Sequence, residues 1–220
     1  ISNKSVAGKR CNIRRRQSGK WLRMTAGLIY IHGFISSPQS LKAQLLGHYV
    51  AEHHSDIHYM VPSLSNTPAE AFRELDQLVQ DYLQNNTGPL GLVGSSMGGF
   101  FATALAERYR LAAVLVNPAV QPHTFGEHFI GAHHNPYTGV DFSLAQTDID
   151  VLQSLVVKPN TGRYWVMVQE QDETLDYRDA VEFYNGVQMT VEAGGDHSFQ
   201  NFDRHLAAIV EFLQLSTPAE

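Results

Sequence analysis

The sequence predicts a single α/β domain, a three-layer α/β/α sandwich around a mainly parallel sheet of about six strands. Short apolar runs alternate with amphipathic stretches along the chain, a pattern typical of parallel strands joined by helices that cover both faces of a sheet. Several runs are apolar at nearly every position, as expected of strands buried on both faces. The length of 220 residues suits one domain with a sizeable core.

The expected elements follow one another in a regular order. Strands are predicted at residues 28–31, 57–61, 90–94, 112–117, 164–169 and 187–192. Helices are predicted near residues 38–53, 68–85, 98–109, 176–184 and 200–214. About 45 residues separate the fourth strand from the fifth, and a connection of that length in a compact domain is typical of a functional insertion. We expect a small cap over about 117–161, helical near 143–156.

Residues 1–23 differ from the rest of the chain in charge. They hold 8 of the 16 basic residues and none of the 22 acidic ones, and they lack the apolar stretch of a secretory signal. A nucleic-acid arm and an organelle transit peptide are alternatives. We expect a basic disordered extension outside the native fold, with Met24 as the natural start and residues 24–220 as the domain. The domain is strongly acidic, which argues against nucleic acid as a partner.

Composition limits the other partners and the cofactors. No run of 18 apolar residues occurs, so we expect no membrane-spanning helix and no membrane partner. Cys11 is the only cysteine and lies outside the predicted domain, which therefore has no disulfide, thiolate nucleophile or cysteine metal ligand. A reducing cytoplasm is the simplest location. The histidines of the insertion match no common zinc spacing, and we expect no metal and no organic cofactor.

The segment that joins the third strand to the following helix reads GLVGSSMGGF. It lacks the lysine of a Walker phosphate-binding loop and the spacing of a dinucleotide fingerprint. Gly94, Ser96 and Gly98 instead fit G-x-S-x-G, the sharp turn that exposes a nucleophilic serine. The two flanking positions favour glycine, because larger side chains would collide across the turn. We therefore expect Ser96 to be the nucleophile and Ser95 a small packing residue; a plain turn is the alternative.

A serine hydroxyl is a weak nucleophile and needs a base. His197 is the best placed of the 11 histidines, because it lies in EAGGDHSF, between the last strand and the final helix. Carboxyl ends of parallel strands share one edge of the sheet, so His197 and Ser96 should meet there. The acid should lie between them in the chain. We choose Asp172, three residues past the fifth strand in VMVQEQDETLDY; Asp176, the alternative, fits the N-cap of the next helix.

Acyl transfer to a serine also needs hydrogen-bond donors for the oxyanion of the intermediate. We expect one donor to be the backbone N–H of Met97, at the start of a helix, and the other to be that of Phe34, in the loop HGFISSP. Gly33 lets the backbone of this loop approach the serine. His32 is expected to order the loop through hydrogen bonds rather than to act as a base.

Six segments form a specific combination: IYIHGFISSP, GLVGSSMGGF, VNPAVQP, NPYTG, LDYRDAVEFY and GGDHSF. From about Leu28 to Leu215, the chain resembles the YqiA-type (UPF0227) family of small bacterial esterases in the α/β-hydrolase superfamily. The resemblance implies an α/β-hydrolase fold and a Ser-His-Asp hydrolase, with Ser96 as nucleophile, Asp172 as acid and His197 as base. Residues 1–23 have no counterpart in the family.

The sequence thus predicts a serine hydrolase that cleaves small-molecule carboxylic esters or acyl thioesters, fatty acyl thioesters included, through an acyl-enzyme. An acyltransferase or a small peptidase on the same fold would use the same residues. A ligand-binding relative without catalysis is a third interpretation, against which the complete set of a serine, a histidine and an aspartate argues. Acyl-chain length and oligomeric state stay open.

Overall fold

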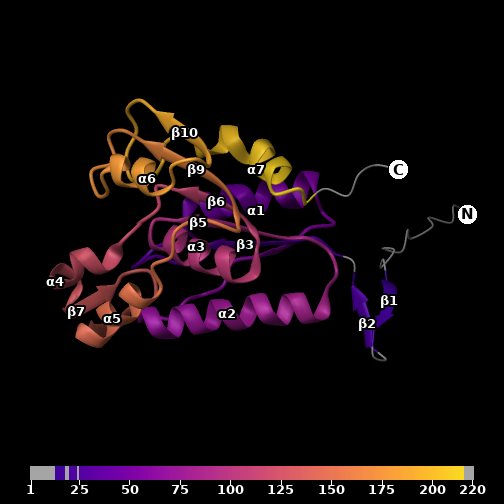
Figure 1. Cartoon of the computed structure of the whole chain (residues 1–220), viewed down its shortest axis with the longest axis horizontal. Helices are drawn as coiled ribbons and strands as arrows, with labels where there is room; N and C mark the ends of the chain where they lie inside the picture. Colours follow the sequence, from indigo (N-terminus) through magenta and orange to yellow (C-terminus); the bar gives the residue numbers. More distant parts are fainter. Residues whose placement is uncertain (1–12, 18–19, 24, 216–220) are drawn as a thin grey trace, which may run out of the picture.

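The computed structural model describes residues 13–17, 20–23 and 25–215. Its centre is a six-stranded sheet in which every neighbouring pair is parallel, in the order β10-β9-β6-β5-β3-β4 (Figure 1). The strands are β3 (Gly27–Ile31), β4 (His58–Met60), β5 (Leu90–Ser95), β6 (Ala112–Val116), β9 (Arg163–Gln169) and β10 (Gln188–Glu192). The six strands predicted from the sequence are confirmed, since each bound differs by at most one residue.

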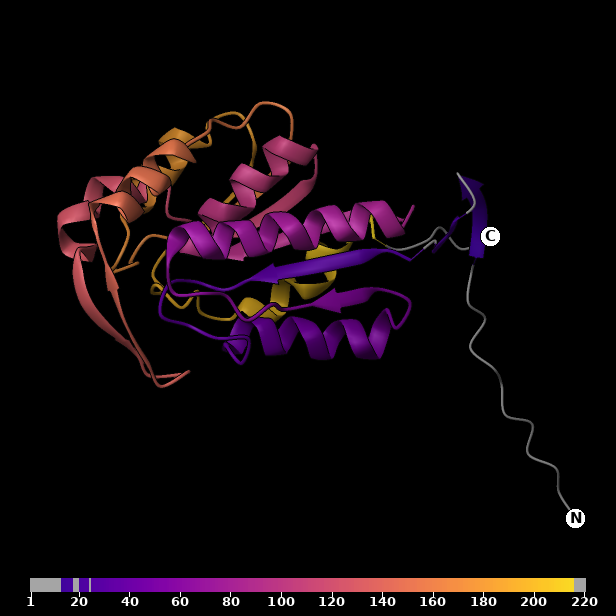
Figure 2. The ribbon, with the colours of Figure 1, turned by 90° about the horizontal axis from the view of Figure 1, so that it is seen from below.

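Helices cover both faces of this sheet, which confirms the predicted three layers (Figures 1 and 2). They are α1 (Leu41–His53), α2 (Pro68–Asn85), α3 (Met97–Tyr109), α6 (Tyr177–Phe183) and α7 (Leu206–Phe212). Successive residues of β3 point to opposite faces: Ile29 belongs to the core formed with α2 and α3, whereas Leu28 belongs to the core formed with α1 and α7. The helix predicted at 200–214 is shorter, because a 3-10 turn, η2 (Phe202–His205), precedes α7.

The insertion between β6 and β9 forms a cap beyond the carboxyl ends of the strands (Figure 2). Its elements are η1 (Pro122–Phe125), α4 (Gly126–Phe129), the antiparallel pair β7 (Gly131–Asn135) and β8 (Val140–Leu144), and α5 (Gln146–Ser154). The helix predicted near 143–156 is present as α5. The hairpin goes beyond the prediction, since β7 reads GAHHN and has no apolar alternation. The segment NPYTG supplies its turn, in which Gly139 has φ 69°.

Residues 13–17 and 20–23 form a second antiparallel pair, β1 (Ile13–Gln17) and β2 (Lys20–Arg23). This pair is separate from the six-stranded sheet. The sequence predicts a disordered extension here; the described residues instead pair as two antiparallel strands, with a shift in register between Ile13 and Arg16. The same prediction also falls on residues 1–12 and 18–19, which lie outside the described residues, as does Met24, the predicted start of the domain.

Deleting residues 1–23 is expected to leave the melting temperature and the rate of ester hydrolysis nearly unchanged. All charged residues of the segment are basic, and it lacks apolar periodicity. Its strands β1 and β2 pair with each other rather than with the six-stranded sheet. Thermal melts of the two chains, followed by circular dichroism, measure this. A melting temperature lowered by more than about 5 °C would show that the extension packs on the domain.

One carboxylate joins α3 to the loop that precedes β9. Glu107 accepts hydrogen bonds of 2.7 to 3.2 Å from the backbone N–H groups of residues 160–162 and from the hydroxyl of Tyr164. Burial would raise the pKa of Glu107, but these hydrogen bonds outweigh it and lower the pKa from 4.5 to about 2. The ionised carboxylate therefore stabilises the folded state.

We expect Glu107→Gln to lower the free energy of unfolding by about 1–2 kcal/mol at neutral pH, a figure reduced for solvent screening. Because the pKa of Glu107 is lower in the folded chain than its ordinary 4.5, the contribution is complete well above that pH and is lost as the pH falls towards about 2. Urea unfolding of both chains at about pH 7 and pH 3 measures the difference. An equal difference at the two pH values would contradict this role.

Candidate active site

Ser96 occupies the sharp turn between β5 and α3. Its backbone has φ 56° and ψ −124°, a conformation that a serine adopts only under constraint. A Cβ at Gly94 would lie 2.3 Å from the carbonyl oxygen of Gly98, and a Cβ at Gly98 would lie 2.0 Å from that of Ile31. The turn therefore has the strained geometry that the sequence motif indicates, and both flanking glycines are required by the close approach of the backbone.

Ser96 begins a chain of hydrogen bonds that runs through His197 to Asp172. The Oγ of Ser96 lies 3.1 Å from Nε2 of His197, and Nδ1 of His197 lies 2.8 Å from Oδ2 of Asp172. The three residues follow β5, β10 and β9 at the common carboxyl edge of the sheet. The side chain of Asp172 is 2% exposed and that of His197 is 24% exposed. Water therefore reaches the imidazole but hardly reaches the carboxylate.

The loop after β9 holds the carboxylate of Asp172 in place. Oδ1 of Asp172 accepts hydrogen bonds from the backbone N–H groups of Thr174 and Leu175, both at 2.8 Å. Burial alone would raise the pKa of Asp172, but the hydrogen bond from His197 and those from the two amides lower it. The alternative acid, Asp176, lies at the N-cap of α6 and accepts hydrogen bonds from Arg178. The geometry thus favours Asp172 as the partner of the histidine.

Two buried amide side chains hold the loop that carries His197. Asn117, which follows β6, donates from Nδ2 to the carbonyl oxygens of Asp196 and His197, at 3.0 and 3.2 Å. Gln169 ends β9, and its Oε1 accepts from the N–H groups of Asp196 and Gln200, at 3.2 and 2.8 Å. Neither residue is among the site residues predicted from the sequence. A polar residue at the carboxyl end of an apolar strand is the signal that could have found them.

Lys42 on α1 also contacts this loop and is absent from the sequence prediction. Its Nζ donates a hydrogen bond of 2.6 Å to the carbonyl oxygen of Ser198. Burial lowers the pKa of Lys42 to about 8, while the carboxylates of Asp196 and Asp172 oppose this shift. At neutral pH the lysine therefore keeps a positive charge near the carboxylate that contacts the histidine.

The loop after β3 passes beside the serine. A Cβ at Gly33 would lie 3.3 Å from the Cβ of Ser96, which is tighter than ordinary contact. His32 is buried, and its Nδ1 donates a hydrogen bond of 3.1 Å to the carbonyl oxygen of Gly33, so its side chain contributes to the order of the loop. Burial also lowers the pKa of His32. Phe34 follows Gly33 in the chain, and Met97 follows Ser96 and begins α3, so both expected oxyanion donors belong to segments that pass beside the serine.

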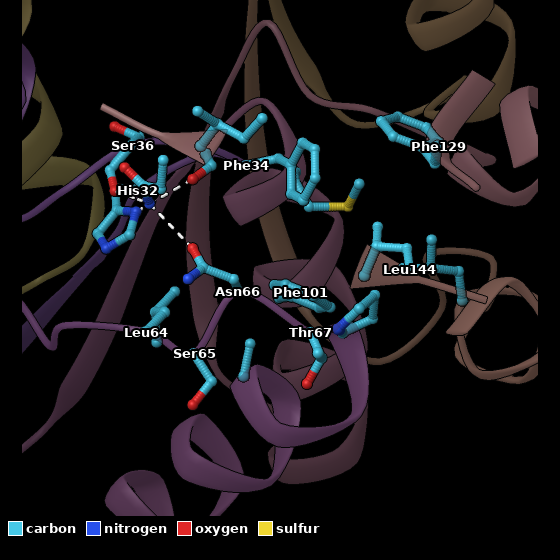
Figure 3. Close-up of a pocket in the computed structure, with 17 residues that line it drawn as sticks. His32, Phe34, Ser36, Leu64, Ser65, Asn66, Thr67, Phe101, Phe129 and Leu144 are labelled. Carbon is cyan, nitrogen blue, oxygen red and sulfur yellow. Dashed lines mark hydrogen bonds between the residues drawn. The ribbon is translucent and has the colours of Figure 1, made fainter. Parts of the chain in front are cut away.

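A pocket lies between the loop after β3, the start of α2 and the cap (Figure 3); Ser96 does not line it, but two lining residues, Gly33 and Met97, adjoin Ser96. Gly33, Phe34 and Met97 line it on the side of the serine, and the start of α2 and the cap complete its wall. Its apolar lining comprises Phe34, Ile35, Leu64, Pro68, Ala71, Met97, Phe101, Phe129, Leu144 and Leu152. Its polar lining includes Ser36, Ser65, Asn66, Thr67 and Asn135. A mostly apolar cavity with a few polar groups is typical of a small-molecule site.

The cap histidines contact other protein groups. Nε2 of His133 lies 2.6 Å from the carbonyl oxygen of Phe129, and Nδ1 of His134 lies 2.7 Å from Oδ1 of Asp141. Among residues 13–17, 20–23 and 25–215, no three His, Cys, Asp or Glu side chains gather where they could hold a metal ion. Within the same ranges, each helix is too short or too polar to cross a bilayer.

The parallel sheet, the strained serine turn and the residues at its carboxyl edge define an α/β-hydrolase fold, and solved structures share it. Est1E from Butyrivibrio proteoclasticus is 16% identical, with a TM-score of 0.68 over 90% of this chain and 96% of that chain. Alpha/beta hydrolase domain-containing protein 10 from mouse is 18% identical, with a TM-score of 0.68 over 94% and 100%. The esterase domain of a Rhodothermus marinus protein is 14% identical, with a TM-score of 0.60 over 94% and 95%.

The model of an uncharacterised protein family, UPF0227, matches residues 27–214. Because this match covers most of the chain, the protein belongs to that family. The resemblance carried by the six sequence segments is thereby confirmed. The structural neighbours, all below 20% identity, show the fold that the family member adopts.

Proposed function

We propose that this protein is a serine hydrolase that cleaves carboxylic esters or acyl thioesters of small molecules through an acyl-enzyme. The observation that carries the proposal is the chain of hydrogen bonds from a strained serine to an imidazole and on to a buried carboxylate, at 3.1 and 2.8 Å. A serine at φ 56° is costly to the fold, and such strain is typical of nucleophiles that must project from a turn. Ester hydrolysis by this route involves no oxidation or reduction, so it requires no redox group.

In the proposed mechanism, Oγ of Ser96 forms a bond to the acyl carbon while Nε2 of His197 accepts the serine proton. Asp172 accepts the hydrogen bond from Nδ1 and so stabilises the imidazolium. The backbone N–H groups of Phe34 and Met97 stabilise the oxyanion. The imidazolium then protonates the departing alcohol or thiol as its bond to carbon breaks. Water attacks the acyl-enzyme with His197 as base, which releases the carboxylic acid and restores Ser96.

We infer that the mostly apolar pocket near the serine binds the acyl group of the substrate. Gly33 and Met97, which adjoin Ser96, belong to its lining, and apolar side chains of α2, α3 and the cap form much of the remainder. An acyl chain in this cavity would have its carbonyl carbon near the serine and its leaving group on the side of His197. Burying each methylene there contributes about 0.8 kcal/mol.

A fluorophosphonate probe and a substrate screen test the proposal together. We expect the probe to label wild-type protein at Ser96, and we expect p-nitrophenyl esters or acyl thioesters of graded chain length to be hydrolysed. Labelling without hydrolysis of any ester or thioester would favour an acyltransferase or a peptidase. A folded protein that neither reacts with the probe nor hydrolyses any substrate would favour the ligand-binding interpretation and would sink the proposed hydrolase.

A further inference from the structure

The backbone of the loop that carries the expected oxyanion donor is strained. Ile35, directly after Phe34, has φ 47°. A β-branched residue is an outlier in this region of backbone conformation, at a cost of roughly 1–3 kcal/mol. A conformation of this kind persists only where surrounding contacts hold it, so the neighbours of Ile35 must supply those contacts.

The first set of contacts comes from the cap and holds the side chain of Phe34. Its ring makes edge-to-face contacts with Phe129, His133 and Phe142, with centroids 5.4, 5.7 and 5.8 Å apart. The rings of His133 and Phe142 stack on each other across the hairpin, at 5.3 Å. The ring of Phe34 is therefore held by α4, β7 and β8. Aromatic pairs of this geometry contribute about 0.5–1.5 kcal/mol each.

The second set of contacts lies on the other side of the strained residue. Asn135, at the end of β7, is 2% exposed. Its Nδ2 donates to Oδ1 of Asn66 at 2.9 Å and makes a longer contact of 3.5 Å with the carbonyl oxygen of Ser36. Its Oδ1 accepts from the N–H of Tyr137 at 3.0 Å, within the hairpin turn. The hairpin thus contacts the residues on both sides of Ile35.

We propose that the cap hairpin is a brace for this turn: Phe142 and Asn135 are positioning residues that hold the strained backbone at Ile35 and so aim the N–H of Phe34 at the oxyanion. The proposal rests on the proposed hydrolase function and adds to it a catalytic role for the cap. The hairpin touches the loop at Phe34 and Ser36, one residue on either side of the strain. A donor must be fixed within a fraction of an ångström to stabilise a transition state, so contacts that are remote from the reacting atoms can govern the rate.

The brace predicts which kinetic constant changes. Phe142 does not itself line the cavity, so Phe142→Ala removes no side chain from the acyl-binding wall. We expect Phe142→Ala to lower kcat about 10- to 100-fold, because a misplaced donor loses part of what one oxyanion donor supplies. The loss should be the same for acetyl and for longer p-nitrophenyl esters, with KM within about twofold of wild type. Inhibition by a boronic acid, which forms a tetrahedral adduct with the serine, should weaken by a similar factor.

Asp141→Asn is the matched control on the same hairpin. Asp141 is exposed and pairs with His134, and its replacement should leave kcat and KM unchanged. Asn135→Ala tests the second contact and should also act on kcat. If Phe142→Ala does not fold, Phe142→Leu retains most of the bulk without the ring geometry and should lower kcat to a smaller extent. Circular dichroism melts establish folding for each variant.

The outcomes separate the brace from the hydrolase. An active wild type whose folded Phe142 and Asn135 variants keep full kcat would overturn the brace alone. A loss confined to KM that grows with acyl-chain length would also overturn it, since the cap would then act only as a wall of the cavity. A wild type that hydrolyses nothing and resists the fluorophosphonate probe would overturn the proposed function, and the brace with it.

Discussion

Replacement of Ser96 by alanine is expected to abolish hydrolysis, with a loss on the order of 10⁶-fold in kcat. The hydroxyl of Ser96 lies 3.1 Å from Nε2 of His197, so the substitution removes the group that the imidazole is proposed to deprotonate. Fluorophosphonate labelling should disappear in parallel, while the melting temperature should stay close to that of wild type, because Ser96 is only half-buried. Activity of purified, folded Ser96→Ala comparable to wild type would reject the nucleophile.

The adjacent serine is the control for this experiment. Ser95 is 7% exposed at the end of β5. We expect Ser95→Ala to keep most of the activity, because Ser96 rather than Ser95 contacts the imidazole of His197. Two serines that adjoin in sequence would thus differ by several orders of magnitude in their effect on kcat.

Replacement of Asp172 by asparagine is expected to lower kcat by about 10⁴-fold. The carboxylate lies 2.8 Å from Nδ1 of His197 and is almost fully buried, so it accepts the N–H that fixes the tautomer of the ring. The amide of asparagine keeps the shape of the side chain but can present an NH₂ group to the ring, which favours the wrong tautomer. Steady-state kinetics at neutral pH measure the loss.

Asp176→Asn is the matched control for Asp172→Asn. The side chain of Asp176 caps α6, where it accepts from the N–H and the guanidinium of Arg178. Asparagine is also a good N-cap, so Asp176→Asn should leave kcat within about threefold of wild type. If Asp176→Asn proves the damaging change while Asp172→Asn stays active, the assignment of the acid is wrong.

A pattern of local spacing was enough to predict the sheet, the serine turn and the position of the histidine. The six strands are short apolar runs, and burial on both faces requires this composition wherever a strand lies in the middle of a sandwich. Gly94 and Gly98 flank Ser96 because any side chain there would meet backbone atoms within 2.3 Å. Such constraints act between neighbours in the chain, so they are visible in the sequence.

The tertiary structure alone decided how the loops at the sheet edge meet. Lys42 contacts the loop of His197 at a separation of 156 residues in the sequence, and Asn117 contacts it at a separation of 80. No local sequence pattern predicts such pairs. The choice between Asp172 and Asp176 likewise depends on which carboxylate reaches the imidazole once β9 and β10 are side by side. The strained backbone at Ile35 and its contacts with the cap hairpin likewise could not be predicted from the sequence. Their energies come from contacts between segments that the chain brings together only on folding, because burial and hydrogen bonding depend on the partner in space rather than on the neighbour in sequence.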